Sequence, residues 1–210
     1  TTETFTIERA LIPLPSVTWR LAPEDERLGI IKVNLIAAST AEEIEKAASD
    51  LDTQGAQFYA LDLRGNGGGL VDAGVNIARL FLSDGDILEE RYRGETPNTY
   101  DVRQPGTLSE IPLVVLVDGN TASAAEIVAG ALQARGRATL VGQPTFGKDV
   151  IQLAFELSDG SSLHVTAAQW SIPGLKTDIG TSGLIPDVRA EIPTDGPDPA
   201  ILAVVVYFNP

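Results

Sequence analysis

The sequence predicts an α/β domain of alternating strands and helices, and three observations support that prediction. Apolar runs of strand length alternate with amphipathic stretches of helix length along most of the 210 residues. Residues 111–117 form a continuous apolar run, which is the pattern of a strand buried on both faces of a parallel sheet. Glycines stand where the pattern changes, as in turns between elements. Strand–helix alternation of this kind is typical of α/β proteins.

In the first half of the chain, each predicted element has its own signal. Phe5 and Ile7 alternate with polar neighbours, and prolines follow, so residues 1–17 are predicted to be a strand and a linker. The pattern Thr40-x-x-Glu43 predicts a capping box, and Gly55 marks the helix end. The expected elements are a strand over 28–37, a helix over 40–54, a strand over 56–63, a glycine turn and a helix over 70–82.

The pattern repeats in the second half. Ser158-Asp159-Gly160-Ser161 is typical of a hairpin turn between two β-rich runs. A closing helix is predicted at the end, although the β-branched residues 204–206 disfavour it. The expected elements are strands over 111–117, 138–141, 150–157 and 162–169, helices over 121–135 and 198–208, and a loop over 173–186.

Composition excludes several classes of protein. No apolar run reaches the length that spans a membrane. The net charge of −14 repels phosphate backbones and anionic lipid headgroups, so nucleic acid and membrane surfaces are not expected partners. The absence of cysteine excludes disulfides and thiolate metal sites, and we expect no cofactor and no metal. The first residue, Thr1, is not a methionine, which predicts a processed or excised piece.

Ser123 is the candidate nucleophile. It follows the apolar run 111–117 and opens an apolar helix. The local pattern Ser123-x-x-Glu126 is also that of a capping box, in which a serine only caps a helix. If Ser123 is a nucleophile, the helix N-terminus would stabilise developing negative charge, and the amide of Ala124 would be one oxyanion donor.

A nucleophilic serine needs a base, and the sequence offers two. His164 is the single histidine, so any Ser-His-Asp arrangement must use it, yet it lies within a predicted strand. Lys148 follows Gly147 among apolar neighbours that could desolvate it and favour the neutral amine that a base requires. By itself, a lysine after Gly147 is more often an exposed turn residue.

The triple glycine at 67–69 follows a strand and precedes a helix. Glycines in such a turn can adopt the positive φ angles that a tight strand-to-helix turn requires. The turn would also let the main chain approach a reacting carbonyl, so that one of its amides becomes a second oxyanion donor. The turn alone does not separate these two interpretations.

Together these segments resemble the carboxyl-terminal processing peptidases, the tail-specific proteases of peptidase family S41. That family carries the turn Asp-Leu-Arg-Asn-Asn-x-Gly-Gly-Leu and the nucleophile motif Thr-Ala-Ser-Ala-Ser-Glu. The corresponding residues here are Asp62-Leu63-Arg64-Gly65-Asn66-Gly67-Gly68-Gly69-Leu70 and Thr121-Ala122-Ser123-Ala124-Ala125-Glu126. Residues 136–149, which contain Thr145-Phe146-Gly147-Lys148, and residues 183–187 are similar to two later family motifs. The resemblance covers roughly residues 5–208.

The resemblance implies a protease-Clp/crotonase-like core of stacked strand-strand-helix units over 18–210, with a PDZ domain missing or reduced to its last strand within 1–17. It implies a serine endopeptidase that cuts near the C-terminus of protein substrates through an acyl-enzyme. Expected partners are proteins or peptides with apolar C-terminal tails, in an extracytoplasmic setting such as the periplasm or thylakoid lumen. The implied site consists of Ser123 as nucleophile, Lys148 as base, Gln152 as the group that orients Lys148, and Gly68 or Gly69 with Ala124 as oxyanion donors.

Two positions complicate this assignment. Where the family has a glycine after the lysine, this chain has Asp149, and a nearby carboxylate favours a protonated Lys148. Alternation in an extended chain would turn Asp149 away from Lys148. Four extended residues span about 13 Å, so contact between Lys148 and Gln152 requires a bend.

Two other functions fit parts of the sequence. Gly142-x-x-x-x-Gly147-Lys148 matches a phosphate-binding loop, but that loop needs a following Ser or Thr and a helix, and Asp149 precedes a β-patterned run. The fold could instead serve as a catalytically silent module that binds an apolar ligand or peptide. The intact pair of Ser123 and Lys148 argues against that alternative.

Overall fold

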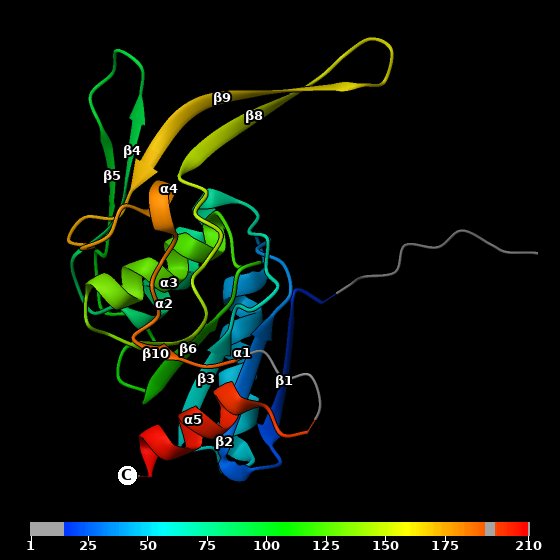
Figure 1. The fold of residues 1–210 in the computed structure, drawn as a ribbon, viewed down its shortest axis with the longest axis vertical. Coiled ribbons are helices and arrows are strands. Elements are labelled where there is room, and N and C mark those ends of the chain that lie inside the picture. The colour runs from blue at the N-terminus through cyan, green and yellow to red at the C-terminus, as the bar shows by residue number, and fades with distance from the viewer. Residues whose placement is uncertain (1–14, 192–195, 210) are drawn as a thin grey trace, which may run out of the picture.

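The computed structural model describes residues 15–191 and 196–209, which form an α/β fold with two sheets (Figure 1). The larger sheet has the order β1-β2-β3-β6-β7-β10, and the smaller has the order β5-β4-β9-β8. The strands are β1 (Val17–Ala22), β2 (Asp25–Val33), β3 (Phe58–Asp62), β4 (Asp86–Tyr92), β5 (Asn98–Asp101), β6 (Leu113–Val117), β7 (Thr139–Gly142), β8 (Val150–Glu156), β9 (Ser162–Ser171) and β10 (Val188–Arg189). The helices are α1 (Thr40–Thr53), α2 (Val71–Phe81), α3 (Ala124–Ala134), α4 (Ile179–Ser182) and α5 (Pro199–Phe208).

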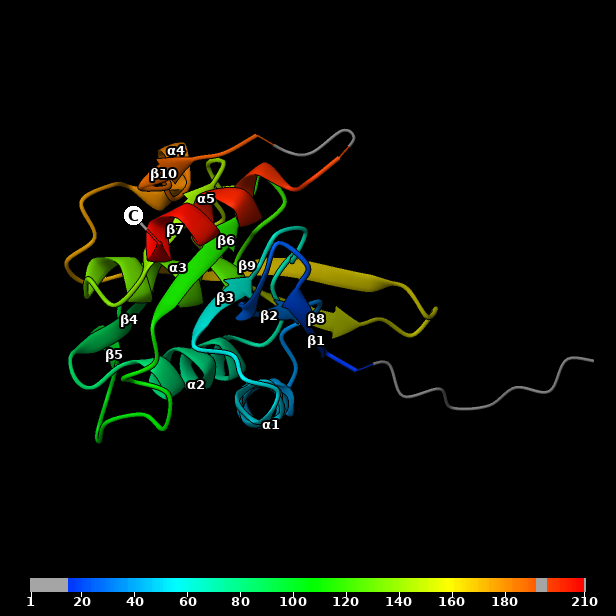
Figure 2. The same cartoon turned by 90° about the horizontal axis from the view of Figure 1, so that it is seen from below.

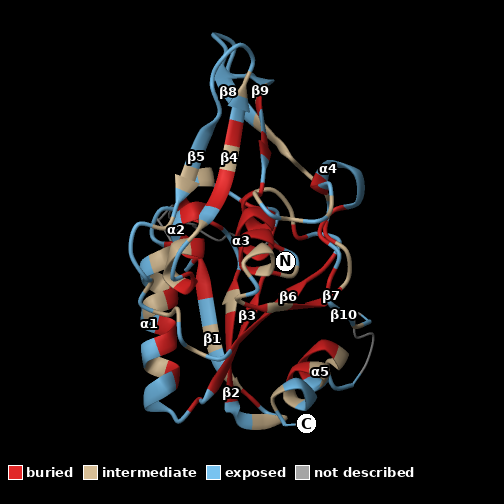
Figure 3. Cartoon of the chain, turned by 90° about the vertical axis from the view of Figure 1, so that its left-hand side faces the viewer, coloured by how far each residue is buried: buried red, intermediate tan, exposed pale blue. Residues whose placement is uncertain are grey.

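The larger sheet is mostly parallel. Strands β2, β3, β6, β7 and β10 run parallel to their neighbours, and β1 pairs antiparallel with β2 at one edge. Every residue of β3 and β6 is buried, as Figure 3 shows in red. Burial on both faces explains why these strands are continuously apolar rather than alternating. The predicted α/β class is confirmed.

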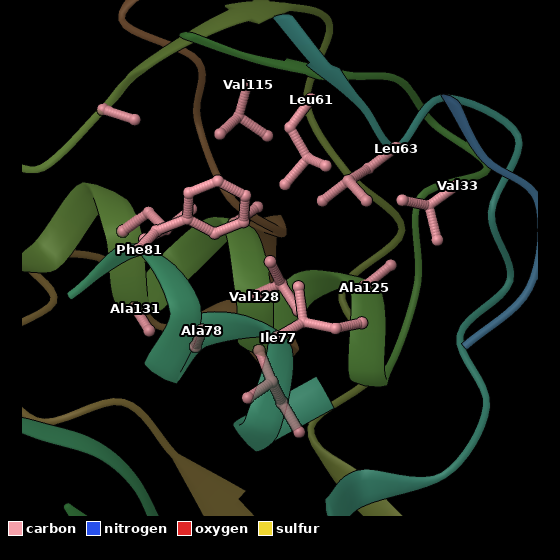
Figure 4. Packing of buried hydrophobic residues seen from close by; sticks show 14 of the residues in the cluster. Val33, Leu61, Leu63, Ile77, Ala78, Phe81, Val115, Ala125, Val128 and Ala131 are labelled. Atoms are coloured by element: carbon pink, nitrogen blue, oxygen red, sulfur yellow. The ribbon is translucent and has the colours of Figure 1, made fainter. Parts of the chain in front are cut away.

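Helices cover both faces of this sheet (Figure 2). Helices α1, α2 and α3 pack on one face, where Figure 4 shows Leu61 and Val115 of the sheet facing Ile77, Phe81 and Val128 of the helices. Helix α5 packs on the other face through Ala200, Ile201 and Val204. Each fully buried aliphatic or aromatic side chain stabilises the fold by about 1.5–3 kcal/mol.

Most predicted elements are present, with small shifts at their ends. The predicted closing helix is α5, whose N-cap residue Asp198 accepts a hydrogen bond from the Ala200 amide at 2.9 Å. Val204 of that helix is fully buried against the sheet. Tertiary packing therefore outweighs the low helix propensity of its β-branched residues.

Three expectations about local structure need correction. The capping box at Thr40 and Glu43 is absent, because the N-cap of α1 is Ser39 and Glu43 accepts from the Ser39 hydroxyl and the Val17 amide instead. The loop over 173–186 contains helix α4, capped by Asp178. Strands β1, β4, β5 and β10 were not predicted. The strand predicted near Phe5 lies outside the described residues.

Strands β8 and β9 form the predicted hairpin, closed by a turn in which the Leu157 amide donates to the Ser161 carbonyl at 2.8 Å. The hairpin projects from the body of the domain (Figures 1 and 2), and its far end is exposed (Figure 3). The helices described here are all too short or too polar to cross a membrane.

Candidate active site

The three motifs singled out in the sequence meet at one edge of the parallel sheet. Strands β3, β6 and β7 are neighbours, and they end at Asp62, Val117 and Gly142. The glycine turn, the Ser123 turn and the Lys148 loop follow these three ends. Ligand sites of open α/β sheets lie outside the carboxyl ends of the strands, so this edge is the expected place for a site.

Ser123 lies at a strained strand-to-helix turn. It is the N-cap of α3, with φ 54° and ψ −122°, and it is the one non-glycine residue at positive φ within the described ranges. Such a conformation costs about 1–3 kcal/mol and persists where the surroundings enforce it. A sharp turn of this kind presents a nucleophile at the start of a helix. The predicted capping box is present, and the Ser123 amide donates to Glu126 Oε2 at 2.8 Å.

The glycine turn lies directly against Ser123. A Cβ atom added at Gly68 would lie 2.9 Å from Ser123 Cβ and 3.0 Å from the Ala124 nitrogen. Only glycine fits there, because φ is also +100°. The Gly68 amide donates to Asn66 Oδ1 at 2.8 Å. The amides of Gly69 and Ala124 have no hydrogen-bond partner among the described residues.

Buried polar side chains tie the glycine turn to strand β2 and to the Ser123 turn, and the sequence analysis did not assign them this role. Asn66 donates to the Val33 carbonyl at 2.8 Å. Asp118 accepts from the Gly65 amide at 2.9 Å, and the Thr121 hydroxyl donates to the Leu63 carbonyl at 2.9 Å. Polar residues directly after apolar strands were the available signal, and each of these three side chains is nearly or fully buried.

Glu126 joins the Ser123 turn to the Lys148 loop. It is fully buried and accepts four hydrogen bonds from those two segments. Its Oε2 atom accepts from the main-chain amides of Ser123 (2.8 Å) and Lys148 (2.9 Å). Its Oε1 atom accepts from the Gly147 amide (2.7 Å) and the Thr145 hydroxyl (2.6 Å). The amide nitrogens of Ser123 and Lys148 therefore cannot lie further apart than the sum of their distances to Oε2, which brings the main chain of the two segments close together.

Lys148 is half-buried, and its amine donates to Gln152 Oε1 at 3.3 Å. The bend that this contact requires has two sources. Lys148 lies in the loop before β8, and the pairing of β8 with β9 shifts register between Ile151 and Gln152. A β-bulge of this kind bends and twists a strand pair. No hydrogen bond joins the Lys148 amine directly to the Ser123 hydroxyl in this arrangement.

The side chains of Asp149 and His164 make their hydrogen bonds away from Lys148 and Ser123. Asp149 Oδ2 accepts from Gln169 Nε2 at 2.6 Å, and no carboxylate among the described residues lies within 4.0 Å of the Lys148 amine. His164 is exposed, pairs with Ala154 towards the far end of the hairpin, and has its ring 3.2 Å from the Ser162 hydroxyl. The structure therefore brings Lys148, and not His164, to the segment that carries Ser123.

An ion pair fixes the start of the glycine turn. Arg64 binds Asp62 through two nitrogens, at 3.0 and 2.8 Å, and binds Asp198 at 2.7 Å, which ties the turn to α5. Burial raises the pKa of Asp62, but the hydrogen bonds and charge of Arg64, with the charge of Lys32, outweigh burial and leave the pKa below its usual value. The described residues hold no cluster of histidine and carboxylate side chains that could bind a metal ion.

The phosphate-loop alternative fails on local structure, because the element after Lys148 is strand β8 and not a helix. A mostly parallel sheet, with a serine at a positive-φ turn and a glycine turn beside it at the carboxyl edge, defines the class of the chain: an α/β protein with a sharp serine turn at that edge. The chain belongs to peptidase family S41, whose family profile matches residues 27–190.

Similar proteins and a similar solved structure support membership of this family. The chain is 46% identical over 189 residues to a carboxyl-terminal-processing protease of Picosynechococcus, covering 89% of this chain and 45% of that protein. It is 41% identical over 185 residues to carboxyl-terminal-processing peptidase 3, chloroplastic, of Arabidopsis thaliana, covering 87% of this chain and 34% of that protein. The solved structure of a photosystem II D1 C-terminal processing protease is similar, with a TM-score of 0.72, 35% identity, and coverage of 88% of this chain and 51% of that one. The chain thus spans about half or less of these proteins.

Proposed function

We propose that this chain carries the catalytic centre of a serine endopeptidase, which cleaves protein substrates near their C-termini through an acyl-enzyme. Ser123 is the nucleophile, Lys148 the general base and Gln152 the group that orients the Lys148 amine. The amide of Ala124, with that of Gly68 or Gly69, donates to the oxyanion. The single observation that carries the proposal is the sharing of Glu126 Oε2 by the amides of Ser123 and Lys148.

The proposed chemistry follows from these positions. A neutral Lys148 amine takes the proton of the Ser123 hydroxyl while the oxygen attacks the carbonyl carbon of the scissile bond. The carbonyl oxygen becomes negative and accepts hydrogen bonds from main-chain amides at the start of α3, where the helix dipole also favours negative charge. Lys148 then passes its proton to the departing amine. The Lys148 amine, neutral again, then activates a water molecule, which attacks the acyl-enzyme and releases Ser123.

Direct proton transfer requires the Lys148 amine to leave Gln152 and turn towards Ser123. Lysine side chains have several freely rotating bonds, and catalytic contacts commonly tighten only when substrate is bound. Of the two glycine amides, that of Gly69 has no partner among the described residues, whereas that of Gly68 must give up its bond to Asn66.

The setting and substrates are proposed from the relatives. One similar protein is a photosystem II D1 C-terminal processing protease, and others are chloroplastic or come from cyanobacteria. We infer an extracytoplasmic setting and substrates with apolar tails. Leu35, Leu70 and Phe146 support an apolar substrate, because they are 56%, 59% and 67% exposed on the segments that border the site.

Four variants test the mechanism: Ser123→Ala, Lys148→Ala, Lys148→Arg and His164→Ala, each assayed on an unfolded protein with an apolar tail. Loss of a general base lowers kcat by about 10²–10⁴-fold, so both lysine variants should be inactive. Arginine keeps the positive charge but cannot lose its proton, so Lys148→Arg separates base from charge. The wild-type rate should rise towards alkaline pH, where the neutral amine is more populated.

Full activity of Lys148→Ala, or a loss confined to His164→Ala, contradicts the proposal. Tight binding of an apolar peptide by the wild type without any cleavage instead supports the silent binding module, for which the apolar residues around the site are the favouring observation.

A further inference from the structure

The β8–β9 hairpin carries an exposed apolar stripe that the proposed chemistry does not use. Its members are Leu153, Phe155, Leu157, Leu163 and Val165, each 42–51% exposed. Leu153 pairs directly with Val165, and Phe155 pairs with Leu163, so these side chains share one face of the ribbon. The opposite face carries polar pairs, such as Gln152 with Thr166.

The stripe continues the packed face of the sheet. Ile151 is two residues before Leu153 on β8, so it has the same orientation, and it packs against the main core. Beyond Ile151 the same face leaves the body of the domain and becomes exposed (Figure 3). Contiguous exposed apolar residues on a soluble domain are typical of binding surfaces.

The edge of the hairpin is open as well. In the described sheet β5-β4-β9-β8, strand β8 has a neighbour on one side only. Edge strands are usually protected by lysine, proline or a charge in the strand. Strand β8 contains no lysine or proline, and its single charged residue, Glu156, is the last one. Such an edge suits the addition of an extended polypeptide.

We infer that the apolar stripe and the edge of β8 form a binding site for an extended apolar segment of the polypeptide substrate, remote from the scissile bond. The choice of a substrate as occupant rests on the proposed function. The hairpin starts two residues after Lys148, so the stripe lies on the strand that leaves the candidate site, on the face opposite to Gln152.

Charge favours a substrate over a second copy of this chain. The hairpin has no lysine or arginine, and its acidic residues, Glu156 and Asp159, lie at the far end. A second copy would bring its own net charge of −14 and would be repelled. An uncharged apolar segment meets no such repulsion.

The inference predicts a dependence on peptide length. Phe155 is seven residues beyond Lys148, which corresponds to about 20 Å along a strand. A peptide of about four residues at the site would not reach the stripe, whereas one of about twelve residues would.

Binding to the Ser123→Ala variant tests this without cleavage. The probes are fluorescein-labelled peptides of alternating leucine and serine, one of about twelve residues and one of about four, and the readout is fluorescence anisotropy. Introducing Phe155→Ser with Leu163→Ser should weaken binding of the long peptide about tenfold or more, because two apolar contacts are lost. The short peptide should be unaffected. The matched control is His164→Ser, on the opposite face of the same hairpin, which should bind both peptides as Ser123→Ala does.

Equal binding of the long peptide with and without the stripe substitutions overturns the inference, and so does an equal loss with His164→Ser. Sedimentation velocity tests whether a second copy of this chain binds the stripe. Self-association that the stripe substitutions abolish also overturns the inference. If the wild type cleaves nothing while stripe-dependent binding persists, the proposed function fails and the binding site stands. If the wild type cleaves its substrate but the stripe substitutions do not change binding, the proposed function stands and the inferred binding site fails.

Discussion

Replacing Glu126 by glutamine changes one buried atom and disturbs both halves of the candidate site. The carboxylate accepts four hydrogen bonds, two on each oxygen, and glutamine turns one oxygen into a donor. Two bonds are lost, and two donors then face the new NH₂ group. Hydrogen bonds to charged groups contribute about 1.5–3 kcal/mol each. Because the buried charge also disappears, part of this is offset, and we expect the free energy of unfolding to fall by about 3 kcal/mol.

The same change should slow catalysis more than a general loss of stability would. Ser123 and Lys148 depend on the same carboxylate oxygen, so its replacement moves one of them relative to the other. A displacement of about 1 Å can cost about 10²-fold in rate. We therefore expect kcat of Glu126→Gln to fall by about that factor at temperatures where the variant is still fully folded.

Urea unfolding followed by circular dichroism gives the free energy, and the peptidase assay gives kcat. Glu42→Gln is the matched control, because Glu42 is exposed in the first turn of α1, and it should cost less than about 1 kcal/mol. Thr145→Val removes one of the four bonds to Glu126 and also the bond that the Thr145 hydroxyl accepts from the Leu184 amide, so it should lower stability while both contacts to Oε2 remain. A Glu126→Gln protein that unfolds within about 1 kcal/mol of wild type, or that keeps its full rate, refutes the reasoning.

Three further predictions concern the same edge of the sheet. Gly69→Ala would place a methyl group against a neighbouring main-chain carbonyl at positive φ, so it should lower stability by about 2 kcal/mol or more in urea, whereas Gly55→Ala, at positive φ in open space, should cost less. Asp62 has a lowered pKa beside Arg64, so its stabilisation is present above its unfolded pKa of about 3.9 and is lost as the pH falls through the folded value. The stability difference between wild type and Asp62→Asn, measured from pH 7 downwards, should therefore shrink below about pH 4 and not above it. Gln152→Glu should shift the acid limb of the pH–rate profile to higher pH, because a carboxylate favours the protonated amine; an unshifted limb argues against contact in the active enzyme.

The sequence predicts the core of the fold because its signals there are local. The run at Leu113–Val117 is apolar throughout, and Gly55 and Gly136 end their helices at positive φ. Strands β4 and β5 carry mostly polar residues and are only partly buried, so neither composition nor alternation revealed them. The prediction of a capping box at Thr40 was wrong because the Glu43 carboxylate accepts a hydrogen bond from the amide of Val17, a residue distant in sequence.

For the site, the sequence indicated which residue types matter but not how they are held. Asn66, Asp118 and Thr121 are polar residues in glycine-containing segments, and on sequence alone they are ordinary turn residues. Their partners are main-chain atoms of other segments, which become neighbours only because β2, β3 and β6 lie side by side. The contact of Lys148 with Gln152 likewise depends on a bulge that arises from cross-strand register.

The two interpretations of Ser123-x-x-Glu126, a capping box or a nucleophile turn, do not exclude one another. The amide of Ser123 donates to Glu126 as in a capping box, and the same carboxylate also accepts from the amides of Gly147 and Lys148. A carboxylate used only as a cap has no need of complete burial, whereas Glu126 is fully buried and all four of its partners are donors. The helix cap is thus also the attachment point of the lysine loop. Any change that weakens the cap should therefore alter the position of Lys148 as well as the stability of α3.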